Sequence, residues 1–147
     1  MSNLIDDFWG HSLKCWDNAI TRQACLDIQN QHMVDINILL LLHWLDCNNQ
    51  HTDELDILFQ LSGDHQRRIL RPLRTARKGL KGTDMYQSIK SIELEAERME
   101  QAALIKAIDI KQGGNDLVQS LTSYFKFMSI IAPEAEAKQI VTYFKKT

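Results

Sequence analysis

Apolar residues recur every three to four positions along most of this chain, which is the period of an amphipathic helix. The stretches with this period cover residues 4–16, 21–31, 35–47, 52–63, 65–81, 85–110, 115–128 and 133–144. Glycines, prolines and short polar clusters separate most of them. We therefore predict an all-α protein, in which residues 1–147 form a single-domain bundle of seven to eight helices.

The stretch at residues 36–45, INILLLLHWL, differs from the others because it is apolar on nearly every side. A helix of that kind belongs in a protein interior, and Asp35 stands where its N-cap should be. We predict that a helix at about residues 34–47 is the buried centre of the bundle. Asn37 and His43 interrupt the stretch, which is far shorter than the roughly 20 residues of a membrane span, so we predict no membrane segment.

Several residues predict where the other helices begin and end. Thr52 and Asp64 are candidate N-caps of the fourth and fifth helices, Gly63 is a candidate end of the fourth, and Asn115 is a candidate cap of the seventh. Pro133 suits the first turn of the last helix. In the stretch 85–110, apolar residues follow a four-three spacing typical of a helix seam, at Met85, Ile89, Ile92, Ala96, Met99 and Ala103. This seam closes either within the chain or between two copies in a homodimer.

Charge is distributed unevenly. Residues 65–81 contain seven Lys or Arg and no Asp or Glu, so the rest of the chain has 10 of the 17 basic residues and all 19 acidic ones. On a helix this segment has two opposite faces: Arg67, Arg71, Arg74 and Lys78 on one, and Ile69, Leu73, Ala76 and Leu80 on the other. Pro72 disfavours a regular helix here and predicts a break or bend.

Such a basic patch on an acidic protein predicts an anionic neighbour. Our leading hypothesis is a non-enzymatic interaction protein that docks an acidic protein partner through Arg67, Arg71, Arg74, Arg77 and Lys78. The second hypothesis is RNA or DNA binding by the same surface, although the net charge of −2 and the lack of aromatic residues between 65 and 81 disfavour it. Alternatively, the arginines pair within the chain with Glu93, Glu97 and Glu100, which form an acidic stripe.

The chain offers few candidates for chemistry, and a small enzyme or metal protein is the third hypothesis. Asp35 and Asn37 are candidates for a ligand site, although helix capping alone explains them. His43, Cys47 and His51 have the i, i+4, i+8 spacing of metal ligands, but a core histidine and an unreactive thiol are the preferred interpretation. We predict no metal site and no cofactor, and we assign no catalytic residue.

Three cysteines at irregular positions favour free thiols in a reducing cytoplasm, and the N-terminal residues lack the pattern of a secretory leader. We therefore expect a cytoplasmic protein.

Several short motifs in the first two thirds of the chain form an ordered set. They are Phe8-Trp9 with Ser12-Leu13, Ala24-Cys25-Leu26 with Gln29, Asp35-Ile36-Asn37 with Leu39-Leu40, Trp44-Leu45, Arg71-Pro72-Leu73-Arg74 with Arg77, and Ile92 to Arg98. In order and spacing this set resembles a family of small, uncharacterised bacterial proteins from gammaproteobacteria, over about residues 6–101. The resemblance implies no activity, cofactor or catalytic residue.

Overall fold

Helix α3 (Ile36–Cys47) lies at the centre of the fold, as its composition predicts. The structure is a computed structural model that describes residues 3–114 and 116–144. Every side chain from Asn37 to Leu45 is buried. Asp35 caps the helix, because its carboxylate accepts a hydrogen bond from the backbone N–H of Asn37 at 2.9 Å.

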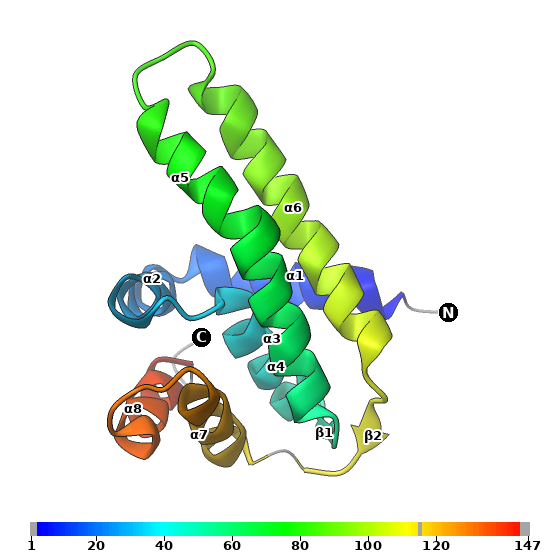
Figure 1. The fold of residues 1–147 in the computed structure, drawn as a ribbon. Helices are drawn as coiled ribbons and strands as arrows, with labels where there is room; N and C mark the ends of the chain where they lie inside the picture. Colours follow the sequence, from blue (N-terminus) through cyan, green and yellow to red (C-terminus); the bar gives the residue numbers. More distant parts are fainter. Residues whose placement is uncertain (1–2, 115, 145–147) are drawn as a thin grey trace.

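The other elements surround α3 (Figure 1). They are α1 (Leu4–Asp17), α2 (Ala19–His32), α4 (Leu55–His65), the π-helical segment η1 (Gln66–Leu70), α5 (Arg71–Gly79), α6 (Tyr86–Ala107), α7 (Leu117–Phe127) and α8 (Pro133–Phe144). Within the described residues the chain thus has eight α-helices, which confirms the predicted all-α fold and the predicted number of helices.

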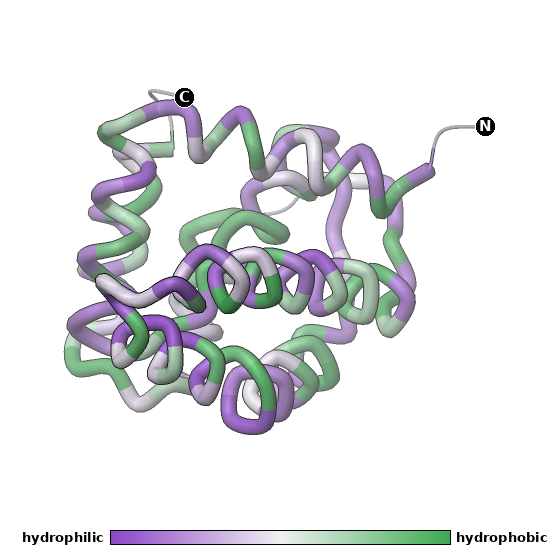
Figure 2. The backbone as a smooth tube through the Cα atoms, turned by 90° about the horizontal axis from the view of Figure 1, so that it is seen from above, coloured by the Kyte–Doolittle hydropathy of each residue, from purple (hydrophilic) through white to green (hydrophobic). Residues whose placement is uncertain are grey.

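One hydrophobic core joins α1 to α4 and α6 to α8. It includes Phe8 of α1, Phe59 of α4, and Tyr124 and Phe144 of α7 and α8. Aromatic rings meet in this core; the Phe59 and Tyr124 centroids, for example, are 5.0 Å apart. Hydrophobic and hydrophilic residues alternate along the outer helices (Figure 2), because each of them buries only one face.

Local capping explains most helix boundaries. Asn18 ends α1 and also caps α2, because its side chain accepts hydrogen bonds from the N–H groups of Ile20 and Thr21. Pro133 begins α8, as predicted. Asp116 caps α7, while the predicted cap Asn115 lies outside the described residues. The prediction for Thr52 is wrong: α4 begins at Leu55, and the Thr52 hydroxyl accepts from the N–H of Glu54 in the preceding turn.

The basic segment is not a separate helix. Gly63 lies inside α4, and α4, η1 and α5 follow one another without a gap from Leu55 to Gly79. In a regular α-helix the ring of Pro72 would collide with the carbonyl of Arg68. The wider π turn before it, in which the Arg71 N–H donates to the carbonyl of Gln66, relieves this collision. The predicted end of the fourth helix at Gly63 and the predicted N-cap of the fifth at Asp64 are therefore both wrong. A π turn accommodates the proline that the sequence suggests as a break.

Helices α5 and α6 form an antiparallel hairpin that extends beyond the rest of the molecule (Figure 1). The apolar face of the basic segment, at Ile69, Leu73, Ala76 and Leu80, would be expected to pack on the core, but it does not: no residue of α5 is buried, and Ala76 is exposed. The seam residues Met85, just before α6, and Ile92 and Met99 on it are exposed, so this part of the seam does not close within the chain.

The structure also contains a short antiparallel strand pair, which the periodicity did not predict. It links two segments that lie about 60 residues apart in the sequence. Strand β1 (Gln50–His51) pairs with β2 (Lys111–Gln112), with Gln50 opposite Gln112. Helix α6 ends at Ala107, before the predicted end at 110, since the chain turns there toward this strand pair.

Candidate functional site

A cavity of about 650 Å³ lies where the α5–α6 hairpin meets α1, α2 and the start of α3. Its volume is within the range of small-molecule and peptide side-chain pockets. The lining combines an apolar wall, a polar floor and charged groups from the hairpin, and includes Trp9, Leu13, Trp16, Leu26, Asp35, Asn37, Leu40, Gln66, Arg74, Arg77, Lys90, Glu93, Leu94, Glu97 and Gln101. Both sets of residues singled out from the sequence, the Asp35–Asn37 pair and part of the basic segment, thus contribute to one cavity.

The polar floor is a hydrogen-bonded network between α3 and α6. The Asn37 side-chain amide donates to Glu100 Oε1 at 2.8 Å and to the backbone carbonyl of Glu97 at 3.2 Å. The Asn37 carbonyl oxygen accepts from Gln101 Nε2 at 2.9 Å, and that same amide also donates to the Ser12 hydroxyl of α1 at 2.9 Å. Asn37 therefore does more than begin a helix: it joins the central helix to α6 directly beneath the cavity.

Asp35 extends this network toward α4 and α7. Its Oδ2 accepts from the Ser62 hydroxyl at 2.7 Å, and its backbone N–H donates to the Tyr124 hydroxyl at 2.7 Å. Asp35 is buried as well as lining the cavity. The capping interpretation is therefore confirmed, and the residue also lines the cavity, while its role in a ligand site stays a prediction.

Two glutamates of α6, Glu97 and Glu100, have raised pKa values. Glu100 is fully buried, and burial together with the charge of Asp35 raises its pKa far above the ordinary value of 4.5. Burial and the neighbouring charge of Glu93 raise the pKa of Glu97 to about 7, despite an opposing effect of Arg74. Glu100 thus holds a proton at neutral pH, and the charge of Glu97 changes in the physiological range.

Two buried acceptors at the floor have no partner among the described residues: Gln66 Oε1 and Gln101 Oε1. Both residues line the cavity. A buried carbonyl oxygen without a donor costs about 1–3 kcal/mol, and native proteins keep few such groups. The floor therefore contains two buried amide oxygens whose hydrogen-bonding capacity the described residues leave unused.

The mouth of the cavity is apolar on one side and basic on the other. Leu13 of α1 and Leu94 of α6 line it, yet they are 50% and 52% exposed. Arg77 forms an ion pair with Glu93 at 2.6 Å, and this pair is largely shielded, with the side chains 25% and 12% exposed. Within the described part of the chain, Arg74 and Lys90 take part in no ion pair, although Arg74 acts on the charge of Glu97 and Lys90 lies 5.9 Å from the centroid of the Tyr86 ring. They are the lining cations whose charge no close carboxylate neutralises.

The five residues predicted to bind a partner do not share one surface. Arg74 and Arg77 line the cavity. Arg67 forms an exposed ion pair with Asp64 at 2.6 Å, and Arg71 donates to the carbonyl of Met33 at 3.4 Å. Lys78 is exposed and lies outside the cavity lining. The predicted pairing with the acidic stripe occurs at Glu93, while Glu100 pairs with amide groups of the floor instead.

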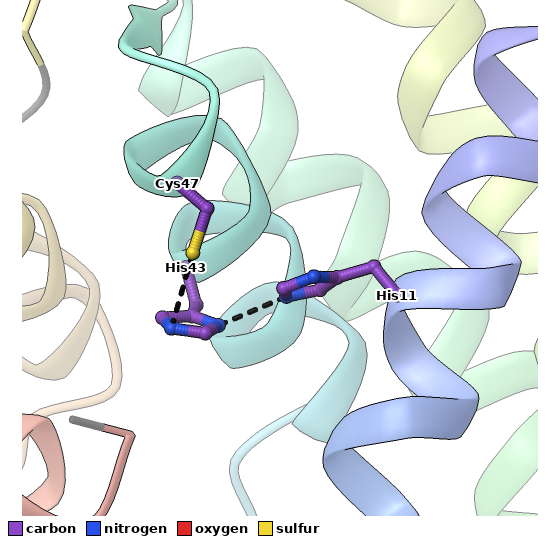
Figure 3. A group of neighbouring side chains, drawn as sticks. All are labelled: His11, His43 and Cys47. Carbon is purple, nitrogen blue, oxygen red and sulfur yellow. Dashed lines mark hydrogen bonds between the residues drawn. The ribbon is translucent and has the colours of Figure 1, made fainter. Parts of the chain in front are cut away.

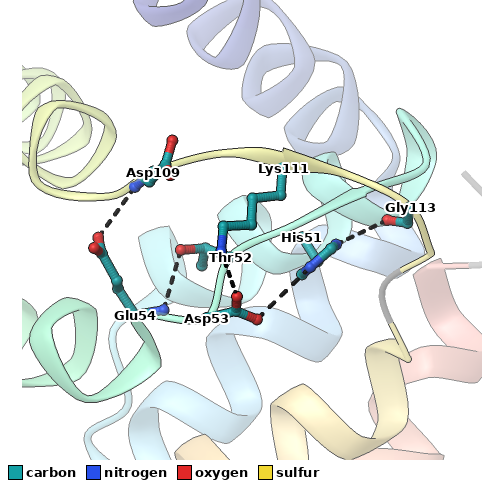
Figure 4. A network of polar contacts seen from close by, with 7 residues as sticks. All are labelled: His51, Thr52, Asp53, Glu54, Asp109, Lys111 and Gly113. Carbon is teal, nitrogen blue, oxygen red and sulfur yellow. Dashed lines mark hydrogen bonds and ion pairs between the residues drawn. The ribbon is translucent and has the colours of Figure 1, made fainter.

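His43 and Cys47 do meet, but His51 lies elsewhere. The ring of His43 contacts His11 of α1 on one side and Cys47 on the other (Figure 3). His51 instead lies 3.2 Å from the carbonyl of Gly113 and 3.7 Å from Asp53, in a polar cluster around the strand pair (Figure 4). Sequence spacing thus identified two members of this cluster and missed His11, since only the packing of α1 on α3 brings it there.

The all-α architecture and the polar cavity beneath a helical hairpin define the chain as a helical protein with a candidate ligand-binding site. No helix among residues 3–114 and 116–144 has the length and apolar character needed to cross a membrane. The chain belongs to the DUF2390 family of proteins of unknown function, whose family model matches residues 7–104. No curated protein and no solved structure matches it.

The matched range covers α1 to α6 almost completely and excludes α7 and α8. All cavity-lining residues fall within it, whereas Tyr124, which supports Asp35, does not. Sequence reasoning missed Gln66, Glu97 and Gln101 as site residues. Their polar character in otherwise amphipathic helices gave no signal, because exposed glutamines and glutamates are common on helices.

Proposed function

We propose that this protein is a non-enzymatic binding protein whose cavity holds a short acidic segment of a partner protein. The proposal rests on one observation: a single cavity of about 650 Å³ has both an apolar wall and two cations, Arg74 and Lys90, that form no ion pair with a described residue. A segment with an apolar side chain next to a carboxylate matches both features, since arginine binds carboxylates well.

An open mouth favours a protein segment over an enclosed small molecule. Leu13 and Leu94 are half exposed at the rim, and apolar rims of this kind are typical of surfaces that a partner covers. The buried amide oxygens of Gln66 and Gln101 have no donor within the described residues, so a side-chain rotation on binding gives each of them a hydrogen bond to an N–H group of such a segment. Acidic residues beside the apolar one then face Arg74 and Lys90.

Nucleic-acid binding has less support. Three cations of the basic segment, Arg67, Arg68 and Arg77, already form ion pairs with Asp64 or Glu93. Binding of RNA or DNA without sequence preference depends on many free cations along one surface. The few that remain are too sparse for the salt-dependent binding that this hypothesis requires.

We further propose a bacterial protein that works in the cytoplasm as one domain. The three cysteines are free thiols in the structure, two of them buried, which suits a reducing compartment. One hydrophobic cluster includes residues of α1 to α4 and of α6 to α8, which supports a single folding unit.

A photo-crosslinking amino acid at the cavity rim tests this function in native cells. Placed at Leu94, it should capture one defined protein that nuclease treatment does not remove. Placed at Ile131, which is 89% exposed between α7 and α8 and far along the chain from the lining, it should not capture that protein. Equal capture at both positions, or capture of nucleic acid only, contradicts the proposal.

Binding of a synthetic peptide from the captured segment then distinguishes the cavity from the outer basic surface. Arg74→Glu should weaken binding about 10- to 100-fold, the value of one charged hydrogen bond. Lys78→Glu makes the same charge change on the same helix outside the cavity and should change affinity less than about threefold. If both variants weaken binding equally, the peptide binds the outer surface and the cavity is not its site.

A further inference from the structure

Two His-x-x-x-Cys pairs, on different helices, face each other beside the core. His11 and Cys15 lie one turn apart on α1, and His43 and Cys47 lie one turn apart on α3. Residues four apart share a helix face, so each helix presents an imidazole and a thiol together. We propose that these four residues form a binding site for a transition metal ion of the zinc type.

The distances between the side chains suit this proposal. Cys15 Sγ lies 3.5 Å from His11 Nε2 and 3.8 Å from His43 Nδ1, and the two nitrogens are 2.9 Å apart. In a tetrahedral zinc site, ligand nitrogen and sulfur atoms are about 3.6 Å apart, and two nitrogens about 3.4 Å. The two imidazoles therefore need to separate by only about half an ångström from their hydrogen-bonded position to hold the ion.

Cys47 completes the set of ligands. Its Sγ lies 3.4 Å from His43 Nε2, and the ligand atoms of His11, His43 and Cys47 are all within 4.8 Å of one another. This contact is to the ring nitrogen of His43 on the side away from His11, so Cys47 must change its side-chain rotamer to join the other three ligands (Figure 3). Its exposed position in the last turn of α3 leaves room on the solvent side for that change. Two imidazoles and two thiolates are a ligand set that favours zinc over magnesium or calcium.

The surroundings allow an ion to enter and hold one ligand in place. A surface depression lined by Asp6, Asp7 and Lys14 also includes two of the four ligands, His11 and Cys47, whereas Cys15 and His43 lie buried behind it. On the inner side the ring of His43 stacks on Phe144, with centroids 4.5 Å apart and planes at 15°. This stacking fixes the orientation of His43, so part of the ordering that a metal site requires is already built into the core.

Metal binding has a proton balance that can be measured. A metal ion binds the thiolate form of cysteine, whereas an ordinary cysteine with a pKa of about 8.5 is mostly protonated at neutral pH. Each thiol that becomes a ligand releases its proton to the solvent, and its sulfur donates an electron pair to the ion. Zinc uptake should therefore release about one proton per coordinated thiol.

The test uses the full-length chain without an affinity tag, reduced and stripped with a chelator. Titration with Zn²⁺ in a calorimeter should give about one ion per chain, with the proton release above measured in two buffers. Co²⁺ should give the absorption bands of a tetrahedral ion bound to thiolate. His11→Asn and Cys47→Ser should each weaken binding more than about 100-fold, as expected for direct ligands.

His51→Asn is the matched control, because this histidine belongs to the sequence pattern but lies beside Gly113 and Asp53. It should bind zinc like the wild type. His11 and Cys47 are only partly covered or exposed, so their variants should fold, which circular dichroism checks. No stoichiometric zinc, no cobalt–thiolate band, or equal loss in the His51 variant would overturn the proposal and leave the His11–His43 contact as an ordinary hydrogen bond.

Discussion

Replacing Glu100 by glutamine should change how the stability of this protein depends on pH. Glu100 is fully buried in α6, and Asn37 donates a hydrogen bond to it at 2.8 Å. Burial and the nearby charge of Asp35 raise its pKa far above 4.5, so the folded protein holds a proton that the unfolded chain has lost at neutral pH. Glutamine keeps an acceptor for Asn37 and a donor toward Asp35 but needs no proton.

The size of the effect follows from proton linkage. Between the unfolded and the folded pKa of Glu100, the folded state binds one extra proton, so the free energy of unfolding falls by about 1.4 kcal/mol for each unit of rising pH. Glu97 adds a second such proton only up to about pH 7. Above pH 7, only Glu100 of these two residues still contributes to the pH dependence. The free energy of unfolding of the wild type should therefore fall by about 2 kcal/mol between pH 7.0 and 8.5.

Urea unfolding followed by circular dichroism at several pH values from 7.0 to 8.5 measures this loss. Glu100→Gln should remove the slope of about 1.4 kcal/mol per pH unit and be more stable than the wild type, by up to about 3 kcal/mol at pH 7. Glu95→Gln, an exposed position on the same helix, is the control and should keep the wild-type slope. A Glu100→Gln variant that keeps this slope would refute the assignment of a buried proton to Glu100.

Three further predictions concern the hairpin. Glu93→Gln leaves the shielded Arg77 without its counter-ion and should lower the free energy of unfolding in urea by about 1–3 kcal/mol. Asp64→Asn, which removes an exposed pair, should lower it by less than about 1 kcal/mol. Equal losses in the two variants would contradict the shielding of the Arg77–Glu93 pair. Because the Glu97 pKa is raised to about 7, an acidic peptide should bind more weakly as pH rises through 7, and Glu97→Gln should remove this dependence in fluorescence titrations. The exposed seam of α6 predicts a homodimer, which Ile92→Glu should dissociate in sedimentation experiments; a wild-type monomer at all concentrations argues against it.

The sequence by itself determined the helices and the identity of the central one. Helical periodicity and capping act over four residues or fewer, so they are visible in the order of residues alone. The composition of the stretch from Ile36 to Leu45 was therefore enough to predict that its helix is buried, and the position of Asp35 was enough to predict that it caps this helix. The same local logic failed at Gly63 and Pro72, because a π turn rearranges hydrogen bonds in a way that residue preferences do not predict.

Tertiary packing decided which side chains meet. The floor of the cavity joins Ser12, Asn37, Glu100 and Gln101 from three helices, and the imidazoles of His11 and His43 come from two. No local pattern relates His11 to His43, which are 32 residues apart, or Asn37 to Glu100, which are 63 apart. Spacing along one helix therefore identified Cys47 as a neighbour of His43, but it suggested His51 as the third member of the cluster instead of His11. Burial in turn sets the protonation of Glu97 and Glu100, because the free energy of a charge depends on the surrounding dielectric, which only the folded structure creates.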